Sequence, residues 1–108
     1  MADNAIYKLH AEVCKALGNA LRIQIIDLLQ DNELSFSDIL KKTKGLKSTL
    51  SQHLSVMVRK GILHQRKEGL NVYFKLSSPK VAKACAIMRE VLVDHLKEQQ
   101  KLHKKLLQ

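Results

Sequence analysis

The hydrophobic positions of this chain follow two different spacings. Over most of its length, apolar residues recur at steps of three and four, as in helices with one buried face, whereas residues 62–76 alternate as strands do. Gly, Asn and Ser-Pro pairs interrupt the pattern where helices end or the chain turns. The spacing predicts helices at 5–17, 20–30, 36–43, 47–60 and 80–106, and strands at 62–67 and 71–76.

Polar residues at the boundaries of these segments support the prediction. Ser35 lies three residues before Asp38, as in a capping box, and Ser78 precedes Pro79, a pair typical of a helix start. Residues 68–71 (Glu-Gly-Leu-Asn) predict a tight turn between the two strands, because Gly and Asn tolerate positive φ. We therefore expect a mostly α-helical fold with one small β-hairpin.

Composition places residues 1–108 in one domain. A hydrophobic content of 45% favours a globular chain, and 4% aromatic residues with no Trp predict an aliphatic core. Two cysteines are too few for a disulfide scaffold, and no apolar run approaches the roughly 18 residues of a membrane-spanning helix. The start of the chain lacks the basic residues and apolar run of a signal peptide, so we expect a cytoplasmic protein.

The basic residues are concentrated in the second part of the chain. The net formal charge is +9, yet residues 1–40 carry three basic and six acidic side chains. Residues 41–80 carry ten basic side chains and one acidic side chain, Glu68. A segregated basic segment in a folded domain points to a polyanionic partner, with nucleic acid favoured over a membrane surface. A solvated basic face without a partner is the alternative that composition leaves open.

The final predicted helix is too long to be covered by a domain of this size. Its apolar positions advance by alternating steps of four and three, the spacing of a coiled-coil seam, and would be exposed in a single copy. We therefore expect self-association through this helix and the first one. The seam consists of Val81, Cys85, Met88, Leu92, His95, Gln99, Leu102 and Leu106, broadened by Leu96.

Helix, turn, helix and basic hairpin follow one another in the order of a winged helix, and particular segments resemble the ArsR/SmtB family of bacterial repressors. The opening motif of the family is resembled by residues 16–26 (ALGNALRIQII). Its recognition helix is resembled by residues 48–54 (STLSQHL), which lead on to residues 60–63 (KGIL). The wing resembles residues 66–76 (RKEGLNVYFKL). The resemblance covers about residues 8–95, which is nearly the whole chain.

This resemblance implies a dimeric winged helix-turn-helix repressor that leaves its operator when a small inducer binds. Residues 47–60 would be the recognition helix, 62–76 the wing and 80–106 the dimerisation helix. Gln52 can bond adenine bidentately, while Arg66 and Lys67 on the wing would contact the DNA backbone or the minor groove. For His53 a packed or capping role is the alternative to a DNA contact. The expected DNA-binding residues are Lys47, Ser48, Thr49, Ser51, Gln52, His53, Arg66 and Lys67.

The inducer sites best known in that family are not reproduced in this chain. The thiolate site has a Cys-x-Cys, and this chain has Ser35 and Ser37 at those positions, where a hydroxyl does not replace a thiolate for a soft metal. The zinc site on the last helix uses Asp-x-His and a more distant His, whereas here an aspartate directly precedes His95 and His103 follows eight residues later. A zinc-responsive repressor that binds the metal through His95, Glu98 or His103 across a dimer remains the alternative.

The two cysteines are the remaining candidates for an inducer site. Cys14 falls on the first helix and Cys85 near the start of the last, and the resemblance implies that these helices form the dimer interface. A thiol-reactive signal such as a persulfide, an oxidant or trivalent arsenic would then alter the dimer geometry. The alternative is that both are small buried apolar residues, as unpaired cysteines usually are.

The sequence offers no pattern typical of an enzyme. It contains no Gly-rich phosphate loop, no Cys-His pair with an evident orienting group and no repeated acidic motif. We therefore predict no catalytic activity, no cofactor and no metal centre, with operator DNA and a second copy of the chain as partners and no membrane. A winged-helix module that binds another protein instead of DNA is the remaining alternative.

Overall fold

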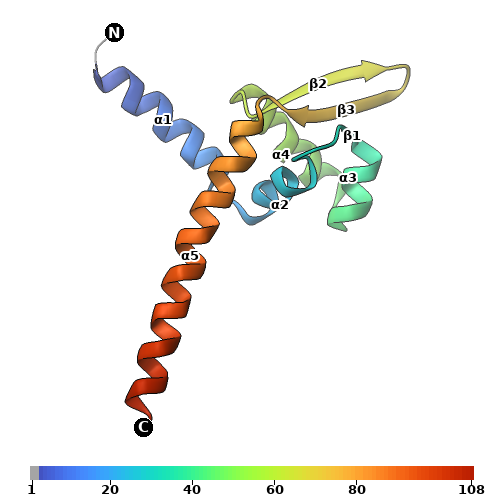
Figure 1. Ribbon diagram of the computed structural model, residues 1–108. Coiled ribbons are helices and arrows are strands. Elements are labelled where there is room, and N and C mark those ends of the chain that lie inside the picture. The colour runs from blue at the N-terminus through green and yellow to red at the C-terminus, as the bar shows by residue number, and fades with distance from the viewer. Residues whose placement is uncertain (1–2) are drawn as a thin grey trace.

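Figure 1 shows a computed structural model of the chain, which describes residues 3–108. All seven elements predicted from the spacing are present in this range, and their ends lie within two residues of the predicted ones. An eighth element is a short strand that was not predicted. The order is α1 (Asp3–Leu17), α2 (Ala20–Leu28), β1 (Leu34–Ser35), α3 (Phe36–Thr43), α4 (Lys47–Arg59), β2 (Leu63–Glu68), β3 (Asn71–Leu76) and α5 (Pro79–Leu106).

The strands form one antiparallel sheet in the order β1-β3-β2. The predicted hairpin is confirmed, with Leu63 of β2 opposite Leu76 of β3. The additional strand, β1, pairs Leu34 with Phe74 on the other side of β3. Two residues are too few to show an alternating pattern, so spacing could not reveal β1. The wing is therefore a hairpin joined to the body of the domain by a third strand.

The hydrophobic core lies between α2, α3, α4 and the sheet. Leu50, Leu54 and Met57 of α4 are four and three residues apart, and none of them is more than 1% exposed. Burial of an aliphatic side chain of this size contributes about 1.5–3 kcal/mol relative to exposure. This packing fixes which face of α4 is turned outward. The other buried apolar residues are Ala16, Ile25, Ile26, Leu29, Ile39, Ile62, Leu63 and Phe74.

Local signals define where the central helices begin and end. The predicted cap at Ser35 is confirmed, because its Oγ accepts a hydrogen bond from the backbone N–H of Asp38. The predicted stop of α3 near Gly45 falls one residue earlier, at Lys44, which adopts the left-handed conformation with φ of 53°. Gly61 follows α4 with φ of 78°, a conformation that a side chain would strain.

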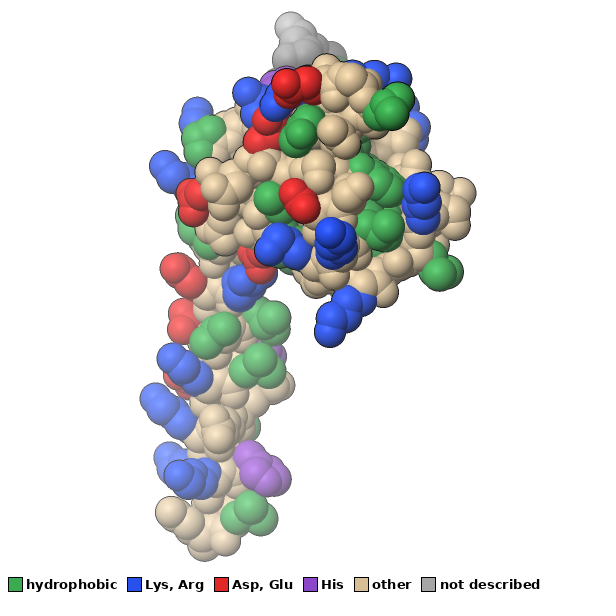
Figure 2. Space-filling view, turned by 90° about the vertical axis from the view of Figure 1, so that its right-hand side faces the viewer, with side chains coloured by type: hydrophobic (Ala, Val, Ile, Leu, Met, Phe, Trp, Pro, Cys, Tyr) green, Lys and Arg blue, Asp and Glu red, His purple; other side chains and the backbone are tan. Residues whose placement is uncertain are grey.

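The two terminal helices extend away from the body of the domain (Figure 1). α5 has 28 residues, none of them buried, and a helix of that length spans about 42 Å. Figure 2 shows apolar side chains along the part of α5 that projects from the body. Among residues 3–108, no helix is both long and apolar enough to cross a membrane. The large exposed apolar residues of α1 and α5 include Ile6, Leu9, Met88, Val91, Leu92, Leu96, Leu102 and Leu106.

Candidate nucleic-acid interface

α4 presents a polar face opposite the side chains that it buries. α3, a three-residue turn and α4 form a helix-turn-helix, whose second helix characteristically offers its N-terminal residues to the major groove. Because Leu50, Leu54 and Met57 point into the core, the intervening residues point outward. His53 is half-buried, and the other predicted contacts on this helix are exposed: Lys47, Ser48, Thr49, Ser51 and Gln52.

His53 is joined to α2 by a side-chain hydrogen bond. Nε of Arg22 donates to Nδ1 of His53 over 2.9 Å, and Nη1 of the same guanidinium donates to the Ala16 carbonyl over 3.2 Å. Burial lowers the pKa of His53, and the positive charge of Arg22 lowers it further, so the ring is neutral near pH 7. A neutral ring that accepts at Nδ1 carries its proton on Nε2. His53 therefore keeps one N–H donor on the side away from Arg22.

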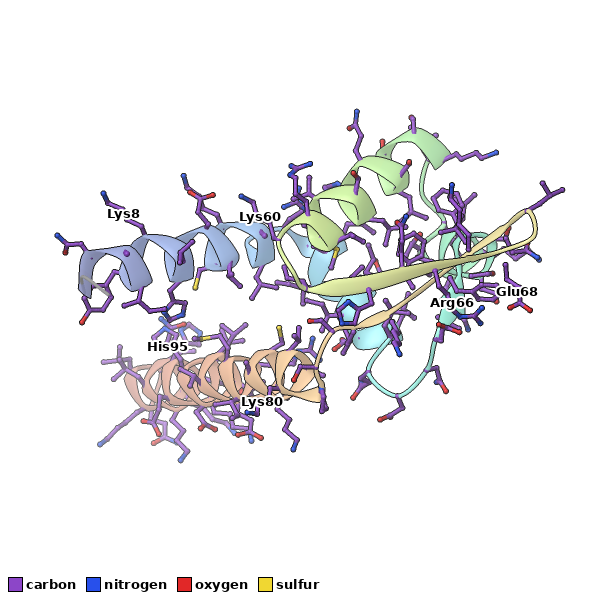
Figure 3. The ribbon with its side chains drawn as sticks, turned by 90° about the horizontal axis from the view of Figure 1, so that it is seen from above. Lys8, Lys60, Arg66, Glu68, Lys80 and His95 are labelled. Carbon is purple, nitrogen blue, oxygen red and sulfur yellow. The ribbon has the colours of Figure 1, made fainter. Side chains whose placement is uncertain are left out.

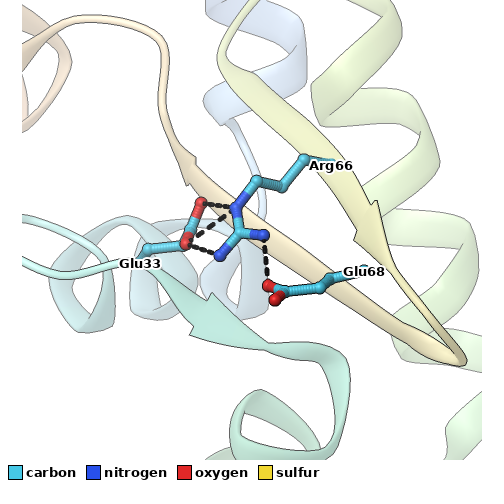
Figure 4. Close-up of polar contacts among 3 residues, drawn as sticks. All are labelled: Glu33, Arg66 and Glu68. Carbon is cyan, nitrogen blue, oxygen red and sulfur yellow. Dashed lines mark hydrogen bonds and ion pairs between the residues drawn. The ribbon is translucent and has the colours of Figure 1, made fainter.

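The wing holds Arg66 in a cluster of ion pairs (Figure 4). Its guanidinium donates to both carboxylate oxygens of Glu33 over 2.7–3.0 Å and to Oε2 of Glu68 over 2.7 Å. It also lies 4.5 Å from the centroid of the Tyr73 ring. The hydrogen bond from Arg66 lowers the pKa of Glu33, and the bonds to Glu33 and Glu68 raise the pKa of Arg66. A DNA phosphate would have to replace these carboxylates, whereas Lys67 is exposed and makes no ion pair with the described residues.

The sheet explains why Glu33 reaches the wing. Tyr73 on the central strand pairs with Ser35 on one side and with Arg66 on the other. Glu33 precedes β1 and is thereby placed across β3 from Arg66. Sequence reasoning missed Arg22 and Glu33 because both act through partners far along the chain. The sequence did offer one signal for Glu68, because it is the one acidic residue among the ten basic residues of segment 41–80.

Cys14 and Cys85 line the same cavity between α1 and α5, which has a volume of about 980 Å³. Both thiols are free; Cys14 is exposed and Cys85 is half-buried. Burial raises the pKa of Cys85, with a further rise from the negative charge of Asp27, so its thiol is mainly protonated near neutral pH. Figure 3 shows His95 on the side of α5 that faces α1. Other residues lining the cavity are His10, Val13, Leu17, Met88, Leu92 and His95.

The histidines and acidic residues of α5 are not gathered into a metal site in a single copy. Among residues 3–108, no group of three or more His, Cys, Asp or Glu side chains is placed to hold a metal ion. His95 lines the cavity described above, while His103 is exposed on the part of α5 that projects from the body. Zinc binding through these residues would need ligands from a second copy.

Comparison with known proteins places this arrangement in a family. The sequence profile described as "Bacterial regulatory protein, arsR family" matches residues 19–65, from the cap of α2 into β2. The arsenical resistance operon repressor of Staphylococcus aureus is 31% identical over 71 residues, which cover 66% of this chain and 68% of that protein. The chain belongs to the arsR family of bacterial regulatory proteins.

Further similarities extend the comparison over most of this arsR-family chain. An uncharacterized HTH-type transcriptional regulator of Mycobacterium tuberculosis (strain H37Rv) is 36% identical over 93 residues, 85% of this chain and 82% of that protein. Its crystal structure has a TM-score of 0.79 at 33% identity and covers 87% of this chain and 95% of that chain.

A solution structure from Mycobacterium bovis has the same TM-score of 0.79, with 32% identity over 88% of each chain. It is a homodimeric winged helix-turn-helix DNA-binding domain, described as a possible ArsR-family transcriptional regulator. The predicted winged helix-turn-helix fold is confirmed. This arsR-family chain is a transcriptional regulator with a DNA-binding winged helix.

Proposed function

We propose that this arsR-family regulator is a homodimeric repressor that binds an imperfect palindromic operator and blocks the promoter by occupying it. One observation carries the proposal: a single molecule exposes both a polar face on α4, suited to DNA, and apolar faces on α1 and α5, suited to a second copy. A two-fold symmetric dimer requires two half-sites about one helical turn of DNA apart. The operator therefore has the symmetry of the protein.

The proposed dimer interface consists of α1 and α5. Both helices expose several large apolar residues, Ile6 and Leu9 on α1 and Met88, Val91 and Leu92 among those on α5, and exposed apolar surface of this kind favours an interaction site. The homodimeric state of the M. bovis domain and the repressor named in S. aureus support this assembly and this mode of action for the present chain.

In the proposed complex, the N-terminal half of α4 enters the major groove. Gln52 is exposed there and can bond adenine bidentately, and hydroxyl groups beside it can bond base edges or phosphates. On the wing, Lys67 contacts the backbone directly, while the ion pair with Glu33 holds Arg66 back, so that Arg66 contacts a phosphate only when that pair opens. The contacts on α4 are Lys47, Ser48, Thr49, Ser51, Gln52 and His53.

Two measurements test this function together. Sedimentation of the purified protein should show a dimer at micromolar concentration, and selection from a random duplex pool should enrich a two-fold symmetric sequence. Gel shifts with unlabelled competitor then measure the preference for that sequence. A stable monomer that still binds selectively would refute the dimeric mode. Binding without any sequence preference would refute operator recognition and support the protein-interaction module.

We also propose that the repressor is released by a thiol-reactive signal acting on Cys14 and Cys85. The support is their shared cavity between the two helices assigned to the interface. Modification there would change how α1 and α5 are arranged in the proposed interface, and packed interfaces move between discrete arrangements. A coupling of about 1–3 kcal/mol between this cavity and the DNA-binding surface is sufficient. Cys14 is the first thiol to react, because Cys85 is half-buried and its pKa is raised.

A further inference from the structure

A second hollow lies beside the recognition helix, next to Gln52, the residue assigned to base reading. It has a volume of about 490 Å³ and opens to solvent between α2 and α4. Two guanidinium groups and an imidazole border it, together with hydroxyl groups, and no carboxylate is among its lining residues. These residues are Arg22, Ser51, Gln52, His53, Ser55, Val56 and Arg59.

The α4 side of the hollow follows from helical spacing. Ser51, Ser55 and Arg59 are each four residues apart, so they form one stripe along the helix, one turn after another. All three side chains are exposed. Gln52, the proposed reader of adenine, lies beside the start of this stripe. A DNA strand whose bases contact Gln52 therefore has its backbone close to the hollow.

On the α2 side of the hollow, Arg22 contributes a positive charge and also fixes the orientation of an N–H donor on His53. Arg22 is held at both ends: its backbone N–H donates to Oδ1 of Asn19 over 3.2 Å, and its guanidinium donates to the Ala16 carbonyl. From this position it donates Nε–H to Nδ1 of His53. The bond leaves Nε2–H of His53 as the free donor of a neutral ring.

We propose that this hollow seats a phosphate of the DNA backbone, which Arg59, Ser55 and Nε2–H of His53 bind directly while Arg22 positions His53. Arg–phosphate contacts are charge-assisted, and hydroxyl and N–H groups are common additional donors to DNA phosphates. Because all these groups are donors, an anion satisfies them together. The proposal rests on the proposed DNA binding and adds Arg22, Ser55 and Arg59 to the site.

The decisive experiment is the salt dependence of DNA affinity for Arg59→Gln, compared with Lys97→Gln as a control. Lys97 is exposed on α5, on the helix face opposite the seam positions His95 and Gln99, so its substitution removes the same charge away from both proposed surfaces. Fluorescence anisotropy would use two probes, the duplex that the wild-type protein selects from a random pool and a duplex of unrelated sequence. Arg59→Gln should flatten the slope of log K against log salt by about 0.9 per protomer on both probes, and Lys97→Gln should leave it unchanged.

Two variants of His53 distinguish the bond that Nδ1 accepts from Arg22 from the bond that Nε2–H donates to the phosphate. In His53→Gln the side-chain amide can place a donor near the former Nε2, whereas His53→Asn can only occupy the place of Nδ1. We expect His53→Gln to retain most of the affinity and His53→Asn to lose about tenfold per protomer. The ¹⁵N shifts of His53 should show the proton on Nε2 and a hydrogen-bonded Nδ1 in the wild-type protein, and the Nδ1 shift should move to that of an unbonded acceptor in Arg22→Leu.

The possible outcomes distinguish this proposal from the function on which it rests. If the wild-type protein selects no duplex, the proposed function is wrong and the phosphate seat fails with it. If it selects a duplex but Arg59→Gln changes the slope no more than Lys97→Gln does, the seat alone is wrong. Titration with inorganic phosphate at constant ionic strength is a further arm. A saturable shift of the His53 and Ser55 resonances at millimolar phosphate is expected of these donors and should be lost in Arg59→Gln, and the absence of any shift would contradict the seat.

Discussion

Replacement of Glu33 by Gln is expected to strengthen DNA binding, although the change lies outside the recognition helix. Glu33 and Glu68 both bond the guanidinium of Arg66, so the three side chains carry a net charge of −1 where the wing should meet the DNA backbone. In Glu33→Gln that charge becomes zero, and Arg66 loses the partner to which it makes most of its hydrogen bonds. Arg66 then becomes available to a phosphate.

The expected magnitude follows from the number of phosphates that are neutralised. One additional phosphate contact per protomer steepens the slope of log K against log salt by about 0.9, and therefore by about 1.8 for a dimer. Between 50 and 200 mM salt, a slope difference of that size changes the affinity ratio of variant to wild type by about twelvefold. The gain is thus largest at low salt and shrinks as salt is raised.

The assay is fluorescence anisotropy with one duplex at four or more salt concentrations. Asp31→Asn is the matched control, since Asp31 is an exposed carboxylate in the same loop and makes no ion pair with the described residues. The same Glu33→Gln change in an Arg66→Ala background completes a double-mutant cycle. An unchanged slope in Glu33→Gln, or an equal gain in the Arg66→Ala background, would show that Glu33 does not hold Arg66 back from a phosphate.

Three further predictions concern base reading, the switch and pH. Gln52→Ala should cost about 1–3 kcal/mol per half-site and relax the preferred sequence, as measured by repeating the duplex selection; an unchanged preference would contradict the docking of α4. A Cys14→Ser, Cys85→Ser double variant should stay on DNA when polysulfide, peroxide or arsenite releases the wild-type protein, and release of both proteins alike would reduce the cysteines to packing residues. Because the pKa of His53 is lowered in the folded protein, its contribution to stability is present above its ordinary pKa of 6.5 and is lost as pH falls through the lowered value. The free energy of unfolding, measured by urea denaturation at equal protein concentration, should therefore fall less steeply from pH 7 to about 5 in His53→Gln than in the wild type. Equal slopes in the two proteins would contradict this role of His53.

The helices were predictable because the information that defines them is local. Leu50, Leu54 and Met57 recur at the helical period, and the same period that buries them turns Gln52 outward. The strand β1 was not predictable in this way, because its two residues are extended through pairing with a strand about forty residues later, as Leu34 with Phe74. Sequence spacing carries no signal for that pairing.

The candidate site was predictable as a set of residue types and not as a set of contacts. Nothing near Arg66 in the sequence indicates that its charge is opposed by Glu33, which lies 33 positions away. The bond from Arg22 to His53 spans 31 positions and depends on how α2 packs against α4. Such contacts arise from the packing of the core, so they appear only once the fold is known.

The absence of any buried residue within α5 makes the order of this helix depend on how much protein is present. Isolated helices are marginal in water, since most helical stability in proteins comes from packing against other elements. In the proposed dimer, α5 beyond its first turns gains that packing from the second copy, so that assembly and ordering of this helix become one equilibrium. Amide hydrogen exchange should accordingly slow in the second half of α5 as protein concentration rises, while exchange in α4 stays constant. For the proposed repressor, operator occupancy then rises more steeply than in proportion to copy number wherever the monomer predominates, so that halving the supply of protein removes more than half of the repression at low occupancy.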